Sequence, residues 1–137
     1  MNDRFKFRMW IESQERMITD VTGFVIDTNK EKIRVFRMNP NMRDGMSSEL
    51  FMLADVTIEQ CTGRDDMNGK LAYEGDIIET YWLGEPCQLV LFYDTFLLCF
   101  RLQPICSDKE EDVCEFTARE DFIILGNIHE NHELLEA

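Results

Sequence analysis

The chain has 137 residues and a mass of 16.2 kDa, the size of one ordinary domain. It is 45% hydrophobic and 30% charged, with only 7 Gly and 3 Pro, so it is neither a disordered chain nor a fibrous or low-complexity protein. Its formal charge of −13 also disfavours a nucleic-acid coat protein, which needs a basic surface. A soluble globular domain remains.

The charge is unevenly distributed. Residues 1–43 hold nine Lys and Arg against six Asp and Glu, a local charge of +3, whereas residues 44–137 hold five against twenty-one, a local charge of −16. Such a negative surface repels DNA, RNA and anionic lipid and attracts basic surfaces of other proteins. The alternative is that the surplus carboxylates only keep the protein soluble.

The N-terminus predicts an amphipathic strand over residues 4–10, because aromatic and basic residues alternate there. If Phe7 and Met9 face the core, Arg8 and Trp10 face outward. An exposed Trp beside an Arg is typical of protein interfaces. The alternative, equally weighted, is that a second sheet covers the Trp.

The next segment predicts a strand at 17–18 after a polar hairpin loop, and a strand pair at 21–26 and 33–38. Asn and Pro residues at 39–41 break the pattern. Apolar residues at helical spacing behind two serines then indicate a short helix over 46–54.

From Val56 onward the strand signals are sharper. Alternation over 56–60 leads to a tight turn centred on Asn68-Gly69. An antiparallel meander follows, with turns at 84–86 and 94–95 and strands at 77–83, 87–93 and 96–102. The apolar runs 87–93 and 96–100 lack alternation, which predicts that both of their faces are covered.

The C-terminal part predicts an exposed acidic loop or frayed helix over 107–121, a last strand at 122–125 and one helical turn over 131–136. The expected fold class is therefore mainly β (β-rich α+β). It consists of a small antiparallel barrel or strongly bent sheet with N-terminal strands and short helical segments. We expect a single domain over 1–137, with an internal boundary near 39–44 that separates N-terminal strands (1–43) from an acidic barrel-like part (44–137).

Targeting and redox signals are weak. No apolar run approaches the ~20 residues of a spanning helix, and the N-terminus has no apolar signal region, so we expect a cytoplasmic protein. The five cysteines form no Cys-x-x-Cys pair and lie far from both histidines, which predicts reduced thiols and no metal or other cofactor.

Three blocks of sequence carry a family resemblance: KFRMW at 6–10, QCTGRDDMNGKLAYEGDII at 60–78, and GNIHENHELL at 126–135. In this order they resemble the YopX family of phage and prophage proteins. The matching blocks lie near both ends and at the centre of the chain, and the central block is the most specific of them. The resemblance implies a small, mostly β, phage-encoded protein of a bacterial cytoplasm with an SH3-like barrel, and it brings no known reaction or cofactor.

The chain departs from the family pattern at several positions. His129 and His132 stand where the family has Tyr and Pro, which argues against a shared role for these histidines. Arg64 replaces a Leu and Cys61 a Tyr, and neither change threatens the fold.

The block at 65–69 has two candidate interpretations. Asp65, Asp66 and Asn68 before Gly69 suggest a calcium loop, but an EF-hand register would place Arg64 and a glycine at ligand positions that need carboxylates. The favoured interpretation is a hairpin in which Asp65 or Asp66 caps backbone amides.

Glu74 and Asp76 form the second candidate site. Alternation places them on one face, where they could serve as an acid/base couple or a Mg²⁺ site. The favoured alternative is a turn into a strand, with a bend at Gly75, backbone hydrogen bonds to Asp76 and a core face beginning at Ile77.

Other candidates are weaker. His129, His132 and Glu133 could share a helical face and bind zinc, but a solvated terminus is the favoured interpretation. Tyr81 and Trp82 could stack on bases, but neighbouring acidic residues disfavour nucleic acid. No nucleophile elbow, phosphate loop or Walker-type lysine is present, so we expect no enzyme activity.

We therefore predict a non-enzymatic phage accessory protein that binds a bacterial or phage protein, one with a basic surface, through its acidic face. A sharper form is a DNA mimic or modulator of a host factor. The expected interaction surface comprises Arg8, Trp10, Glu74, Asp76 and Trp82. The alternatives are a self-assembling scaffold that pairs edge strands at 4–10 and 122–125, and a metal-dependent hydrolase. Neither direct nucleic-acid binding nor membrane binding is expected.

Overall fold

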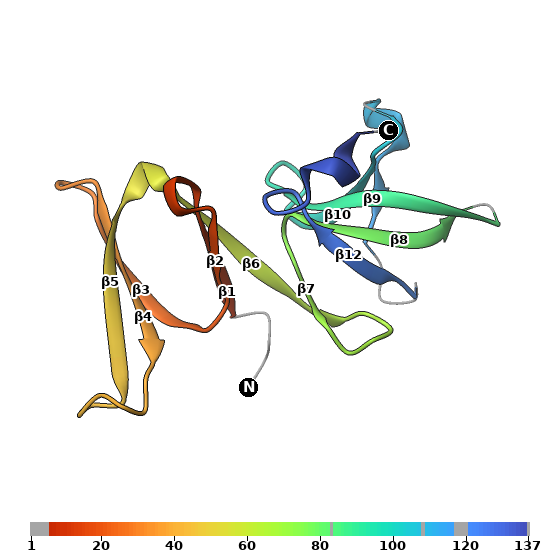
Figure 1. The fold of residues 1–137 in the computed structure, drawn as a ribbon. Helices are drawn as coiled ribbons and strands as arrows, with labels where there is room; N and C mark the ends of the chain where they lie inside the picture. Colours follow the sequence, from red (N-terminus) through yellow and green to blue (C-terminus); the bar gives the residue numbers. More distant parts are fainter. Residues whose placement is uncertain (1–5, 83, 108, 117–120, 137) are drawn as a thin grey trace. The chain divides into compact units, whose positions relative to one another are not determined.

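The computed structural model describes residues 6–82, 84–107, 109–116 and 121–136, of which 58% lie in strands and 10% in short 3-10 turns (Figure 1). In this described part no helix is long and apolar enough to cross a membrane. The chain divides into two compact units, Lys6–Gln60 and Cys61–Ala137. The mainly β fold class is thus confirmed.

The first unit holds two groups of strands. The hairpin β1 (Phe7–Ile11) and β2 (Arg16–Ile18) continues onto the first half of β6 (Val56–Asp65), with β1 in the middle. The antiparallel strands β3 (Val21–Asp27), β4 (Lys32–Met38) and β5 (Met46–Met52) form a separate three-stranded sheet. Because β1 pairs on both sides, it is not the exposed edge that the self-assembly hypothesis required.

The core of the first unit lies between these strands. One face of β4 buries its alternate apolar residues, and β1 buries both of its faces. The core cluster comprises Met9, Ile11, Ile18, Ile33, Val35 and Phe51.

The second unit is built on a five-stranded antiparallel sheet. Its order is β11 (Cys114–Glu115), β10 (Cys99–Pro104), β9 (Glu85–Asp94), β8 (Asp76–Trp82) and β12 (Ile123–Asn127), and the short β7 (Leu71–Tyr73) pairs with the second half of β6. The core cluster of this unit comprises Ala72, Ile78, Leu89, Leu91, Leu102, Phe122 and Ile124. The predicted meander is confirmed.

A closed SH3-like barrel is not confirmed. In the described residues the sheet order leaves β11 and β12 at its two ends, so the sheet is open. The short helical segments are 3-10 turns, among them Leu53–Asp55 and His132–Leu135.

The helix predicted over 46–54 is wrong. Residues 46–52 form β5, which pairs with β4 along seven consecutive positions. Phe51 reaches the core from one face of this strand, while Leu50 and Met52 are exposed on the other. Sheet pairing supplies the backbone hydrogen bonds that a short isolated helix would have made alone.

The units do not divide near 39–44. Residues 39–45 form the turn between β4 and β5, where the Asn39 amide donates to the Gly45 carbonyl at 2.7 Å. Because those two strands pair along their length, they belong to one unit, and the division falls within β6 instead.

Candidate functional site

Arg8 and Trp10 do not form an exposed surface. Their exposed fractions are 5% and 4%. Arg8 lies directly opposite Glu59 on β6, and its Nε donates to Glu59 Oε1 at 2.9 Å. The Trp10 indole Nε1 donates to Glu12 Oε2 at 2.7 Å. A cross-strand carboxylate thus allows a guanidinium to be buried, which the alternation pattern of one strand does not reveal.

Glu74 and Asp76 lie at the turn that leads from β7 into β8. Gly75 between them has a φ of +84°, which L-residues with a Cβ rarely adopt, so the predicted bend is confirmed. Asp76 is 1% exposed, and its Oδ2 accepts the Tyr73 amide at 2.8 Å, which confirms the predicted backbone cap. Ile77 behind it is buried, as predicted. Among the described residues no group of three or more His, Cys, Asp or Glu is arranged to hold a metal ion.

Trp82, the last expected surface residue, ends β8, and its side chain lies outside the part that the structure describes. Its neighbour Tyr81 is strongly exposed. The five expected residues are therefore not brought together into one exposed surface: three are buried, Glu74 is half-buried, and Trp82 stays a prediction.

Asp66 joins the central motif to the last strand. Its Oδ1 accepts the amides of Asn68 and Lys70 at 2.9 and 2.8 Å, and its Oδ2 accepts the amide of Ile124 at 2.9 Å. Burial raises the pKa of this carboxyl, but the three amides outweigh burial and hold the pKa below its ordinary value. The predicted hairpin cap is confirmed, and it also reaches β12.

The C-terminal motif is a second network of this kind. Asn127 Oδ1 accepts the amides of His129 and Glu130, and the Asn131 side chain accepts the amide of Asn127 at 3.1 Å. The Ile128 amide donates to the Gly75 carbonyl at 2.9 Å, which links this motif to the central one. These polar groups of the two motifs build the fold.

The two departures in the central block also have structural roles. The Arg64 guanidinium lies over the rings of Phe116 and Phe122, at 5.1 and 5.2 Å from their centroids. Cys61 is fully buried, and its sulfur accepts the Gly63 amide. Cation–π stacking thus replaces the apolar contact that a Leu would supply at position 64.

The thiols near β9 do not resemble a nucleophilic site. Cys87 and Cys106 line one hollow of about 580 Å³ together with Pro86 and Pro104, and both are free thiols. Burial, together with the neighbouring Cys106, raises the pKa of Cys87. A raised pKa leaves less thiolate, which is the reactive form.

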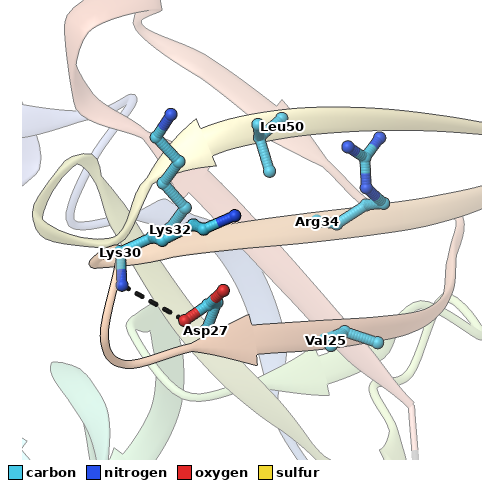
Figure 2. A pocket seen from close by; sticks show the side chains of 6 residues that line it. All are labelled: Val25, Asp27, Lys30, Lys32, Arg34 and Leu50. Atoms are coloured by element: carbon cyan, nitrogen blue, oxygen red, sulfur yellow. Dashed lines mark hydrogen bonds between the residues drawn. The ribbon is translucent and has the colours of Figure 1, made fainter.

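A different feature, which the sequence analysis missed, lies on the outer face of the three-stranded sheet. A hollow of about 360 Å³ opens there between the β3–β4 turn and β5 (Figure 2). Its lining combines three cations and one carboxylate with two exposed apolar side chains: Val25, Asp27, Lys30, Lys32, Arg34 and Leu50. We call this the cationic hollow.

The cationic hollow is held by local hydrogen bonds. Asp27 accepts the backbone amide of Lys30 at 3.1 Å (Figure 2) and that of Asn29 at 3.1 Å, which fixes the turn. Arg34 donates to the Ser48 hydroxyl across the sheet at 3.1 Å. The signal was present in the sequence, because Lys32 and Arg34 alternate with the buried residues of β4.

The comparisons with known proteins agree with this architecture. The model of a family described as YopX protein matches residues 6–136. The chain belongs to the YopX family. Among solved structures, protein yopX from Bacillus subtilis superposes with a TM-score of 0.62 at 16% identity, covering 99% of this chain and 100% of that one. Protein EF1440 from Enterococcus faecalis superposes with a TM-score of 0.57 at 24% identity, covering 96% and 97%. No curated protein matches the chain.

Membership of the family shows the fold and gives no activity. Two of the three sequence blocks that carried the resemblance contain the backbone-capping residues Asp66, Asp76, Asn127 and Asn131. These four residues therefore hold turns of the fold in place.

Proposed function

We propose that the chain is a non-enzymatic protein-binding module of a phage or prophage, and that it acts in the bacterial cytoplasm through its acidic unit. The observation that carries the proposal is the division of charge between the units. Residues 61–137 hold five Lys and Arg against seventeen Asp and Glu, a formal charge of −12, whereas residues 6–60 hold eight against nine, a charge of −1. Almost the whole charge of the protein therefore lies on one unit.

Several acidic side chains of this unit face solvent, among them Glu85, Glu111 and Glu115. An exposed carboxylate surface attracts a basic protein surface over distances set by salt and repels nucleic acid and anionic lipid. Long-range attraction of this kind raises association rates and selects partners by charge. The proposed partner is a bacterial or phage protein with a basic surface, and a nucleic-acid-handling protein is the sharpest form of it.

Affinity capture from bacterial lysate tests this proposal. A tagged chain is used at about 0.05 M and about 0.5 M salt, because exposed charges are screened at the higher concentration. We expect one basic protein to be retained at low salt and lost at high salt. Addition of duplex DNA should displace the chain from that protein if the acidic unit occupies a DNA-binding surface.

Charge variants show which unit is responsible. Glu85→Gln with Glu111→Gln removes two charges from the acidic unit and should weaken retention severalfold. Glu15→Gln with Glu31→Gln removes two exposed charges from the other unit and should leave retention unchanged. If retention is the same at the two salt concentrations, or if the two double variants weaken it equally, the acidic unit is not the binding surface.

A further inference from the structure

The tip of the β9–β10 hairpin exposes three consecutive large apolar side chains. Phe96, Leu97 and Leu98 are 93%, 56% and 73% exposed. The sequence pattern predicts a strand over 96–102 with both faces covered, but β10 begins only at Cys99 and residues 95–98 form the turn. We call residues Phe96–Leu98 the apolar tip.

Hydrogen bonds to Asp94 hold the turn of the apolar tip. Asp94 Oδ1 accepts the amides of Phe96 and Leu97 at 2.9 and 3.1 Å, and the Leu98 amide donates to the Asp94 carbonyl at 2.7 Å. The other carboxylate oxygen pairs with Arg101 at 3.2 Å. The hydrogen bond from the Leu97 amide lowers the pKa of Asp94 most, and those from Arg101 and the Phe96 amide lower it further. The carboxylate that caps the turn is therefore ionised at neutral pH.

The turn of the apolar tip has two energetically unfavourable features. Leu98 has a φ of +57°, a left-handed conformation that Gly or Asn adopts at lower cost. Consecutive exposed apolar residues at a turn are also unfavourable in water. Strain and exposure at one rigid position are typical of a surface that binds something.

The cationic hollow on the other unit is complementary to the apolar tip. It offers the exposed side chains of Val25 and Leu50 as apolar contacts, and three cations for the carboxylates of an acidic partner. The apolar tip belongs to the unit that carries the charge of −12. The same chain therefore carries an apolar tip on an acidic unit and, on its other unit, a hollow with apolar and cationic side chains that suit it.

We infer that the apolar tip of one chain docks in the cationic hollow of a second copy. Phe96 is the anchor, with Leu97 and Leu98 around it, and Lys32 and Arg34 face the acidic unit of the incoming copy. This contact goes beyond the proposed function, since its partner is another copy and its residues are different. Because tip and hollow are different surfaces, the contact is heterologous, and a pair of chains still has one unused tip and one unused hollow, which can bind further copies.

Sedimentation and light scattering of the purified full chain test this contact. We expect the average mass to rise above 16.2 kDa, and past that of a dimer, from about 10 μM to about 1 mM, the range in which small interfaces associate. Phe96→Ser in the tip, or Arg34→Glu in the hollow, should weaken association at least about tenfold. The matched controls Met67→Ser and Arg43→Glu, also at exposed positions, should associate like the wild type.

Mixing the two variants is the decisive step. The Phe96→Ser chain keeps its hollow and the Arg34→Glu chain keeps its tip, so their mixture should form a one-to-one dimer that neither forms alone. Circular dichroism confirms that both are folded. A wild-type chain that stays at 16.2 kDa throughout, or a mixture that stays monomeric while the wild type associates, would overturn the inference. No lysate is involved, so this contact and the binding of a basic protein can fail separately.

Discussion

Asp66 shows how a single carboxylate connects distant parts of this sequence. Its two oxygens hold the β6–β7 turn and the start of β12, which are 58 residues apart in the chain. At 7% exposure the carboxylate is withdrawn from water, and its acceptor sites are occupied by amides that would otherwise be buried without partners.

We predict that Asp66→Asn lowers the free energy of unfolding at neutral pH by about 1–3 kcal/mol, because one oxygen becomes an NH₂ group and leaves at least one amide without its acceptor. The folded pKa of Asp66 lies below its ordinary value, so its stabilisation is complete above the unfolded pKa and is lost as pH falls through the folded pKa. The stability gap between wild type and variant should therefore narrow in acid. Urea denaturation at several pH values measures it, and a gap that stays constant down to acid pH would contradict this role.

The hairpins show how far sequence patterns determine single elements. The β3–β4 pair and the β8–β9–β10 meander were predictable, because alternating apolar residues and turn signals act within a few residues of each other. The strand β5 was not predictable, because its apolar residues also fit the spacing of a helix. Pairing with β4 makes this segment a strand. The apolar tip was missed because an apolar run normally indicates a buried strand.

At the tip itself, backbone conformation separates two neighbouring leucines. Leu98 has a positive φ and Leu97 does not, while both side chains are exposed. Leu98→Gly relieves a left-handed conformation that costs Leu about 1–2 kcal/mol, which offsets the extra freedom of Gly in the unfolded chain. Leu97→Gly has only the entropic cost. We therefore predict that Leu98→Gly is more stable than Leu97→Gly by about 1 kcal/mol or more in denaturant melts, and equal stability would show that the turn is not strained.

At the scale of the molecule, the sequence indicated that negative charge is concentrated in the C-terminal part, but the predicted internal boundary near residues 39–44 lies within the first unit. The division lies within β6, a strand that pairs with β1 up to Gln60 and with β7 from Cys61 onward. The apolar alternation of Val56 and Ile58 does break near this position, because the next buried apolar residue, Cys61, lies on the opposite face of β6. The predicted boundary relied instead on the Asn and Pro residues at 39–41. The burial of Arg8 was equally hard to predict, because the carboxylate that pairs with it lies 51 residues away on β6.

Two compact units with separate cores imply separate stabilities. The clusters around Ile33 and around Leu89 share no residue. Truncation of a fully buried Ile or Leu to Ala costs about 2–5 kcal/mol, and that loss should fall on the unit that contains the cavity. In amide hydrogen exchange read by mass spectrometry, Ile33→Ala should accelerate exchange over β3–β5 and leave β8–β10 close to wild type. Leu89→Ala should do the reverse. Equal acceleration of both regions by either variant would show that the continuous strand β6 makes the two units unfold as one.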